Sequence, residues 1–282
     1  MGSMSICLNA VLFTVKGVDV KDNKYIPIFY MWFSQLIRCG GLTSTDILYL
    51  YTDAVTLSSL QENIVYTLLQ PTCPFKLQLL VYPQPATLME GMMIRFNYND
   101  YVQDIFMYCD IDILILKPLR HLMTAVVPNV IYVHAEGCLS DDNYGAAFSK
   151  EELQQFLPDA LGFSSGKFFI YGTDTHKRLY QEVNDLYESS DKTIAPFYTF
   201  DQPYYNKALY QMLQQNVCKI NINYISYPFV LTNNFNITDE SVLLDAMGIP
   251  GDGAFHHTKL LQLYVLLQHI MPQMAMPETP IN

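Results

Sequence analysis

Basic side chains are scarce in this chain of 282 residues. It has 16 Lys and Arg against 27 Asp and Glu, which gives a formal net charge of -11 at pH 7. Nucleic-acid backbones are held by clustered Lys and Arg, so this balance argues against a nucleic-acid partner. It leaves room for a local basic site that contacts a single diphosphate.

Cysteine motifs are also missing. The six cysteines form no Cys-x-x-Cys pair, and Cys109 lies inside an apolar run. Half of the residues are hydrophobic, so the chain can bury a core of its own without a disulfide framework. We therefore expect free thiols in a reducing compartment.

Long apolar runs are absent as well. None approaches the roughly 18 to 20 residues that a membrane-spanning helix needs. The N-terminal residues show no basic segment followed by an apolar one, so we expect no signal peptide and a cytoplasmic location. An apolar helix expected at 258–270 would either pack on the core or make peripheral contact with a membrane or a partner.

What the sequence does contain is a regular alternation over its first 115 residues. Apolar runs typical of strands alternate with segments that have helical spacing. Fully apolar strands joined by helices indicate βαβ units and a mostly parallel sheet with helices on both faces. The strands are expected at 5–15, 46–51 and 75–82, with a strand that runs into a turn at 104–114, and the helices at 28–39, 57–69 and 87–98.

After residue 115 the alternation becomes less regular. No repeat or low-complexity linker divides the chain, so we expect one α/β domain over residues 4–270 and a loose tail at 271–282. A polar loop is expected at 136–144. Strands are expected at 130–134, 167–171 and 219–227, and helices at 151–156, 174–189, 202–216 and 258–270.

The most informative short motif is Asp110-Ile111-Asp112, which follows an apolar strand-like segment. Two carboxylates one residue apart can both reach a cation where a strand ends and the backbone turns. At the carboxyl end of a parallel sheet such a pair faces the ligand crevice. A D-x-D occurs about once by chance in a chain of this composition, so its position gives the motif its weight.

Two later segments have small or polar side chains at the ends of expected elements, where they are candidate site residues. Ser164-Ser165-Gly166 precedes the strand expected at 167–171 and is either an ordinary turn or part of a site. Asp201 and Gln202 stand at the head of a helix. Asp201 can be an N-cap ahead of Pro203, a functional carboxylate, or both.

A third segment joins a glycine-rich turn at 251–253 to His256, His257 and Lys259. Either histidine is a candidate third metal ligand, with ordinary polar surface as the alternative. Lys259 is a candidate phosphate contact.

The order of these motifs resembles that of the GT-A glycosyltransferases. The resemblance is strongest to the family 8 branch, which includes the glycogenin-like and lipopolysaccharide galactosyltransferase-like enzymes. It covers roughly residues 5–259 and rests on short motifs. The chain departs from the family in two places: GDGAFHHTKL stands where the family has His-x-x-Gly-x-x-Lys-Pro-Trp, and Ser164-Ser165-Gly166 stands where it has Asn-x-Gly.

The resemblance implies a GT-A fold with a nucleotide-binding half at 4–115 and an acceptor half at 116–270. It implies an enzyme that transfers a sugar from a nucleotide-diphosphate donor, UDP-linked by preference, to a hydroxyl of a glycan, protein or lipid. In that family Mn²⁺ is bound by the D-x-D aspartates and a late histidine, so Mn²⁺ or Mg²⁺ is expected on Asp110, Asp112 and either His256 or His257. The implied donor contacts are Thr14, Arg95, Asp110, Ile111, Asp112, Ser165, Gly166 and Lys259.

The same resemblance places Asp201 and Gln202 near the anomeric carbon as the catalytic pair. If the reaction inverts the anomeric configuration, a carboxylate must act as base, and Asp201 is the first candidate. If the reaction retains it, Asp201 or Gln202 lines the reacting face instead.

Other classes remain as alternatives. A haloacid-dehalogenase-like phosphohydrolase also places D-x-D after an apolar strand, but that strand usually opens the chain, and here about a hundred residues precede it. A sugar-nucleotide pyrophosphorylase needs a Gly-rich basic segment after the first strand, where TVKGVDVKD has a single Gly. A non-catalytic sugar-binding module would bind the nucleotide sugar without turnover.

Overall fold

The computed structural model describes residues 4–123, 125–193, 199–222, 226–228 and 242–245. The helix expected at 258–270, the tail at 271–282, and the candidate residues His256, His257 and Lys259 lie outside these ranges.

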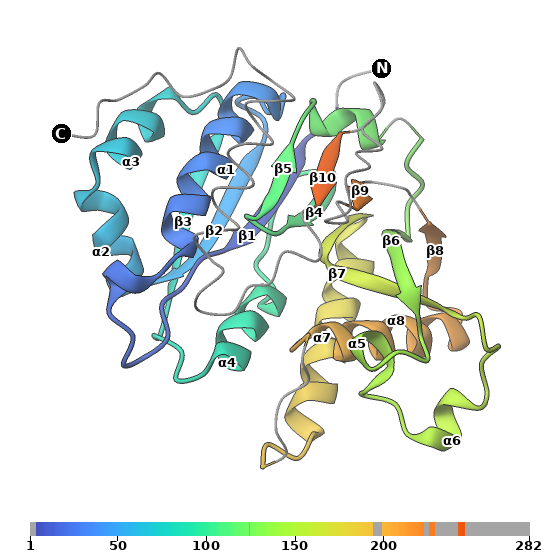
Figure 1. Cartoon of the computed structure of the whole chain (residues 1–282). Coiled ribbons are helices and arrows are strands. Elements are labelled where there is room, and N and C mark those ends of the chain that lie inside the picture. Colours follow the sequence, from blue (N-terminus) through green and yellow to red (C-terminus); the bar gives the residue numbers. More distant parts are fainter. Residues whose placement is uncertain (1–3, 124, 194–198, 223–225, 229–241, 246–282) are drawn as a thin grey trace.

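A seven-stranded sheet forms the centre of the molecule, with strand order β3-β2-β1-β4-β7-β6-β8 (Figure 1). Neighbouring strands are parallel, except that β7 runs antiparallel to both β4 and β6. The sheet joins strands from both expected halves of the chain. The strands are β1 (Ile6–Val11), β2 (Ile47–Asp53), β3 (Lys76–Tyr82), β4 (Ile105–Cys109), β6 (Val130–Cys138), β7 (Leu161–Tyr171) and β8 (Lys219–Ile222).

A smaller sheet of three short strands begins with β5, which follows directly after the D-x-D motif. Its order is β5-β10-β9, with β10 antiparallel to β5 and parallel to β9. The strands are β5 (Ile113–Ile115), β9 (Ser226–Pro228) and β10 (Leu243–Asp245).

Helices cover both faces of the central sheet. The apolar residues of β1 alternate between two cores: Ile6 and Leu8 face one, Cys7 and Val11 the other. The first core is closed by α1 (Tyr25–Cys39), α2 (Ala54–Glu62) and α3 (Ile64–Leu69). The second is closed by α4 (Leu88–Met93), α7 (Thr173–Ser189) and α8 (Gln202–Gln214). The α/β class with a mostly parallel sheet is therefore confirmed.

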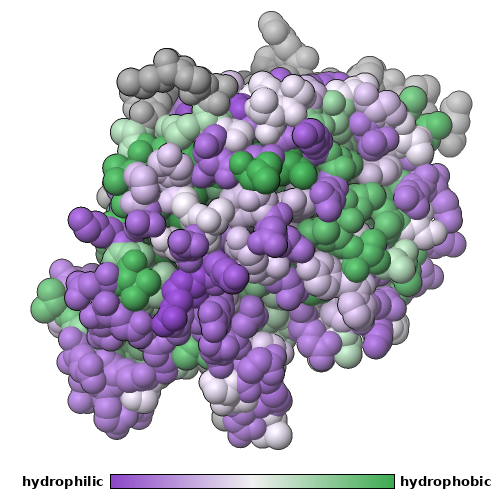
Figure 2. All heavy atoms as spheres, turned by 180° about the vertical axis from the view of Figure 1, so that it is seen from behind, coloured by the Kyte–Doolittle hydropathy of each residue, from purple (hydrophilic) through white to green (hydrophobic). Residues whose placement is uncertain are grey.

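The remaining helical elements are short. They are α5 (Asp142–Gly145) and α6 (Lys150–Leu153), with 3-10 turns η1 (Val20–Asp22), η2 (Gln70–Thr72), η3 (Ile94–Phe96) and η4 (Leu119–Met123). Seen from behind, polar side chains dominate the lower part of the molecule, and apolar side chains gather in separate patches above it (Figure 2).

The structure corrects several sequence predictions. The strand predicted at 219–227 is two strands, because β8 belongs to the seven-stranded sheet and β9 to the smaller one. The single helix predicted at 57–69 is two helices, because the side chain of Asn63 accepts a hydrogen bond from the Val65 amide (2.8 Å) and starts α3 anew. The polar loop predicted at 136–144 is occupied at its two ends by β6 and α5. The turn predicted at Ser164-Ser165-Gly166 lies inside β7, because β7 continues past β4 along β6, where Phe163 pairs with Ala135.

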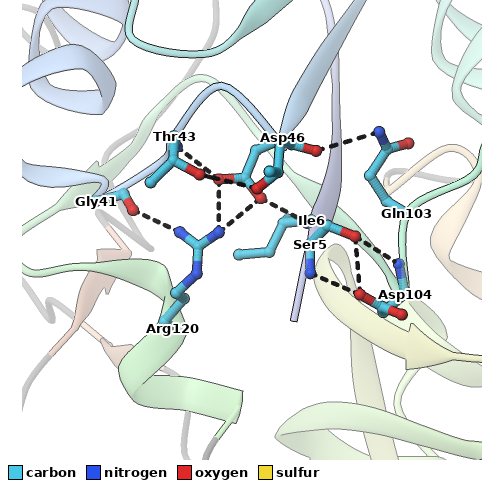
Figure 3. Close-up of polar contacts among 9 residues, drawn as sticks. Ser5, Ile6, Gly41, Thr43, Asp46, Gln103, Asp104 and Arg120 are labelled. Atoms are coloured by element: carbon cyan, nitrogen blue, oxygen red, sulfur yellow. Dashed lines mark hydrogen bonds and ion pairs between the residues drawn. The ribbon is translucent and has the colours of Figure 1, made fainter. Parts of the chain in front are cut away.

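The amino edge of the sheet is fixed by a buried carboxylate. Asp46 accepts hydrogen bonds from the Ile6 amide (2.7 Å) and from the guanidinium of Arg120 (2.6 and 2.7 Å), which joins the starts of β1 and β2 to η4 (Figure 3). Beside it, the exposed side chain of Asp104 accepts from Ser5 and links β1 to β4. These contacts hold the sheet together and lie at the edge opposite the D-x-D motif.

Candidate functional site at the carboxyl edge of the sheet

The strand order creates a switch point between β1 and β4. From β1 the chain continues to β2 and β3 on one side, and then crosses back to add β4 on the other side. In open α/β sheets, ligands bind at such a point, in the crevice outside the carboxyl ends of the strands. Asp110 follows β4 directly, and Thr14 lies three residues beyond the end of β1.

Arg95 lies at the centre of the candidate site. Its side chain is 2% exposed and comes from η3. Nη2 lies 3.3 Å from Oδ1 of Asp110, and Nη1 lies 3.6 Å from Oδ2 of Asp201 and donates to the carbonyl of Ser165 (3.3 Å). The guanidinium also lies over the ring of Tyr108, 4.7 Å from its centroid. Arg95, Asp110, Ser165 and Asp201, all predicted from the sequence, are thus brought together.

Asp110 is held on several sides. Its amide donates to the carbonyl of Gly166 (2.8 Å), and its Oδ1 accepts from the hydroxyl of Tyr108 (2.7 Å). Burial raises the pKa of Asp110 to about 6; Asp112 and Asp201 also raise it, while Arg95 and Tyr108 lower it. Neighbouring acids disfavour the ionised form of such a carboxyl group, and a nearby cation stabilises that form.

The two other D-x-D residues differ in burial. Asp112 is half-buried, and its charge is close enough to raise the pKa of Asp110. Ile111 packs into the core with 5% of its surface exposed. Any donor contact by Ile111 therefore has to come from its backbone.

Asp201 does not cap its helix. It has helical backbone angles, and its side chain makes no hydrogen bond to the first turn of α8. The carboxylate is 1% exposed and faces Arg95, and no donor in the described part of the chain completes a hydrogen bond of good geometry to either oxygen. Burial raises the pKa of Asp201, and Arg95 and the Ser165 side chain lower it in part. Asp201 therefore occupies the N-cap position of α8, but the expectation that its side chain caps the helix is wrong.

The residue before Asp201 has an unusual backbone conformation. Phe200 has φ 50°, in the left-handed region that aromatic residues rarely adopt. Such conformations persist where the surrounding structure holds them, and they are common at functional sites.

Gln202 connects β7 to α5. Its side-chain oxygen accepts from the Ser165 amide (3.2 Å), and its nitrogen donates to the Asn143 carbonyl (3.1 Å). One turn later, Asn206 bonds both the amide and the carbonyl of Phe163 (2.8 Å each). No local pattern pointed to Asn206, because its partners lie on a distant strand.

Thr14 lies at the carboxyl edge with its hydroxyl already bonded. Oγ1 is 2.7 Å from the hydroxyl of Thr56 and accepts from the side-chain Nδ2 of Asn23 (2.9 Å), while the backbone amide of Thr14 donates to Oδ2 of Asp53 (2.8 Å). This network joins the segment after β1 to the start of α2.

The oxygen donors present suit a hard divalent cation. Mg²⁺ is usually bound by one or two carboxylates together with waters and substrate phosphates, and carboxylates also suit Mn²⁺. Asp110 and Asp112 supply such a pair. Within the described ranges no cluster of three or more His, Cys, Asp or Glu side chains is arranged around a common point.

Comparison with known proteins adds no family assignment. No protein-family model matches the chain, and no curated protein matches it in sequence. None of the helices in the described ranges has the length and apolar character to cross a membrane. The fold and the site define an α/β protein with an arginine-centred acidic site at the switch point of a mostly parallel mixed sheet.

Proposed function

We propose that the protein is a metal-dependent glycosyltransferase of the GT-A type, which transfers a sugar from a nucleotide-diphosphate donor to an acceptor hydroxyl. The proposal is supported by the position of Asp110 and Asp112 directly after β4, at the switch point where ligands of α/β sheets bind. It is also supported by the motif order that the chain shares with the family 8 enzymes.

The observation that carries the proposal is the contact of Arg95 with both Asp110 and Asp201. A helix cap would account for Asp201 without any function, but its side chain makes no cap hydrogen bond and is buried 3.6 Å from Arg95. Burial of a carboxylate without matching hydrogen bonds costs free energy, so such an arrangement is typical of a functional site.

Asp110 and Asp112 are the residues that would hold Mn²⁺ or Mg²⁺. When bound there, the cation would offset the negative charge that develops on the leaving nucleotide diphosphate. Gly166 supports the fit: a Cβ at this position would lie 2.4 Å from Oδ2 of Asp110, so glycine leaves the room that this oxygen occupies.

The protein's own groups have separate roles in this proposal. Arg95 keeps the two carboxylates at a fixed separation, which preorganises the site before the donor binds. Asp201 faces the reacting sugar. If transfer inverts the anomeric carbon, Asp201 takes the proton of the acceptor hydroxyl, a role favoured by its raised pKa. If transfer retains the anomeric configuration, the carboxylate of Asp201 or the side-chain oxygen of Gln202 stabilises positive charge on the sugar ring.

The first experiment is a thermal-shift panel of nucleotide sugars, each with and without Mn²⁺. A ligand that binds the folded state raises the melting temperature by mass action, so the panel identifies the donor. We expect a UDP-sugar to give the largest shift, and only with Mn²⁺. An Asp110→Asn/Asp112→Asn double variant should keep its fold and lose this shift.

Two assays separate the alternatives. Release of UDP from a UDP-sugar, dependent on Mn²⁺ and lost in the double variant, supports the transferase. Release of phosphate from a generic phosphate ester supports a phosphohydrolase instead, and binding without turnover supports a sugar-binding module. Metal-dependent turnover that persists in the double variant would rule out the proposed site.

A further inference from the structure

We propose that Tyr108 is a positioning residue that determines which oxygen of Asp110 is offered to the divalent cation. This inference rests on the proposed function, because it concerns the same metal site. It assigns a role to a side chain that no short sequence motif singled out.

The two oxygens of Asp110 have different surroundings. Oδ1 accepts a hydrogen bond from the Tyr108 hydroxyl (2.7 Å) and lies 3.3 Å from Nη2 of Arg95. Oδ2 faces Gly166, where a single added carbon would lie 2.4 Å away. The carboxylate is thus held through Oδ1, while Oδ2 lies against Gly166 and the side chain as a whole is 28% exposed.

Tyr108 is itself rigidly held. It is fully buried in β4, its ring stacks on that of Phe168 (centroids 5.9 Å apart), and the guanidinium of Arg95 lies over it. A fixed donor of this kind orients a ligating carboxylate, in the way that outer residues orient the ligands of known metal sites.

Tyr205 offers a matched comparison on the same face of the sheet. It is equally buried and also packs on Phe168 (5.0 Å), but its hydroxyl has no hydrogen-bond partner within the described residues. Tyr205→Phe therefore removes a buried hydroxyl without touching Asp110. A role of Tyr108 in the core alone predicts that the two Tyr→Phe variants behave alike.

The test is direct binding of Mn²⁺ to the full-length protein, measured from the loss of the free-ion electron paramagnetic resonance signal. We expect Tyr108→Phe to weaken Mn²⁺ binding by about 10- to 100-fold and Tyr205→Phe to leave it unchanged. Gly166→Ala, which crowds Oδ2 from the other side, should weaken binding as well. Circular dichroism and melting temperature report whether each variant is folded.

The outcomes are distinguishable. Wild-type protein that binds Mn²⁺ no more tightly than Tyr108→Phe overturns the inference and leaves the proposed function standing. Equal weakening in Tyr108→Phe and Tyr205→Phe also overturns it, because a general loosening of the core would then explain both. Wild-type protein that does not bind Mn²⁺ at all overturns the inference together with the metal-dependent function.

Discussion

The guanidinium of Arg95 lies 3.6 Å from the carboxylate of Asp201, although the two residues come from elements more than a hundred positions apart. The same guanidinium is 3.3 Å from Asp110. The buried guanidinium therefore links the end of a central strand to the start of a helix in the other half of the chain. The separation of Asp110 and Asp201 depends on this guanidinium.

Replacing Arg95 tests this link. Arg95→Lys keeps the charge, but an ammonium group cannot make the planar contacts to two carboxylates and the Ser165 carbonyl at once. We expect the Mn²⁺-dependent turnover of the UDP-sugar to fall by about 10²-fold, since small displacements of reacting groups have effects of that size. Steady-state kinetics measure the loss.

The control is Arg178→Lys, which changes an exposed arginine paired with Glu182 on α7. It should leave turnover unchanged. Full activity in Arg95→Lys would show that the two carboxylates do not need their common partner.

Removing the charge of Asp201 distinguishes a functional carboxylate from a structural one. Asp201→Asn keeps the shape of the side chain and its position before α8, so we expect the protein to fold. Transfer should fall by about 10²- to 10⁴-fold if Asp201 moves a proton. Asp174→Asn, an exposed acid in the first turn of α7, is the matched change and should have no effect on transfer. Wild-type rates in both variants would remove Asp201 from the mechanism.

His176 should make stability depend on pH. Its ring is buried and stacks on Phe106 (3.6 Å between centroids), and burial holds its pKa well below 6.5. In the unfolded chain the pKa returns to about 6.5, so below that pH the unfolded state binds a proton that the folded state excludes. The free energy of unfolding should fall as pH is lowered through about 6.5, by at most about 1.4 kcal/mol per pH unit.

Urea unfolding of wild-type protein and His176→Phe at pH 7.5 and pH 5.5 isolates this contribution. The variant keeps an aromatic ring against Phe106 and cannot take up the proton, so its stability should change less between the two pH values. Identical pH dependence in the two proteins would show that His176 does not titrate differently on unfolding.

Substitutions at the amino edge of the sheet should lower the free energy of unfolding and leave Mn²⁺ binding unchanged. Asp46 is fully buried and pairs with Arg120, so Asp46→Asn leaves that arginine without its charge partner. We expect a loss on the order of 3 kcal/mol in the free energy of unfolding, measured in urea. Asp104→Asn, which alters the exposed carboxylate at the same edge, should cost less than about 1 kcal/mol. Both variants should bind Mn²⁺ like the wild type, and a selective loss of binding in either would contradict this separation.

The sequence by itself determined the class of fold and the place of the acidic motif. Alternating apolar strands and amphipathic helices are local patterns, so they predicted the order of β1 to β4 and that helices join them, although the helix predicted at 57–69 is two helices. The end of β4 at Cys109 put Asp110 at the carboxyl edge of the sheet for the same local reason. Local patterns also misled: the small polar residues of Ser164-Ser165-Gly166 are typical of a turn, but they lie inside β7 because neighbouring strands extend along it.

Only the tertiary structure decided which of these residues meet. The order of the strands, with β4 between β1 and β7, brings Ser165 and Asp201 to Arg95, and that order depends on how distant segments pack. The direction of the Asp201 side chain and the bond from Tyr108 to Asp110 follow from the same packing. Periodicity records which face of an element is buried, whereas the partner across that face is set by contacts between residues far apart in the chain.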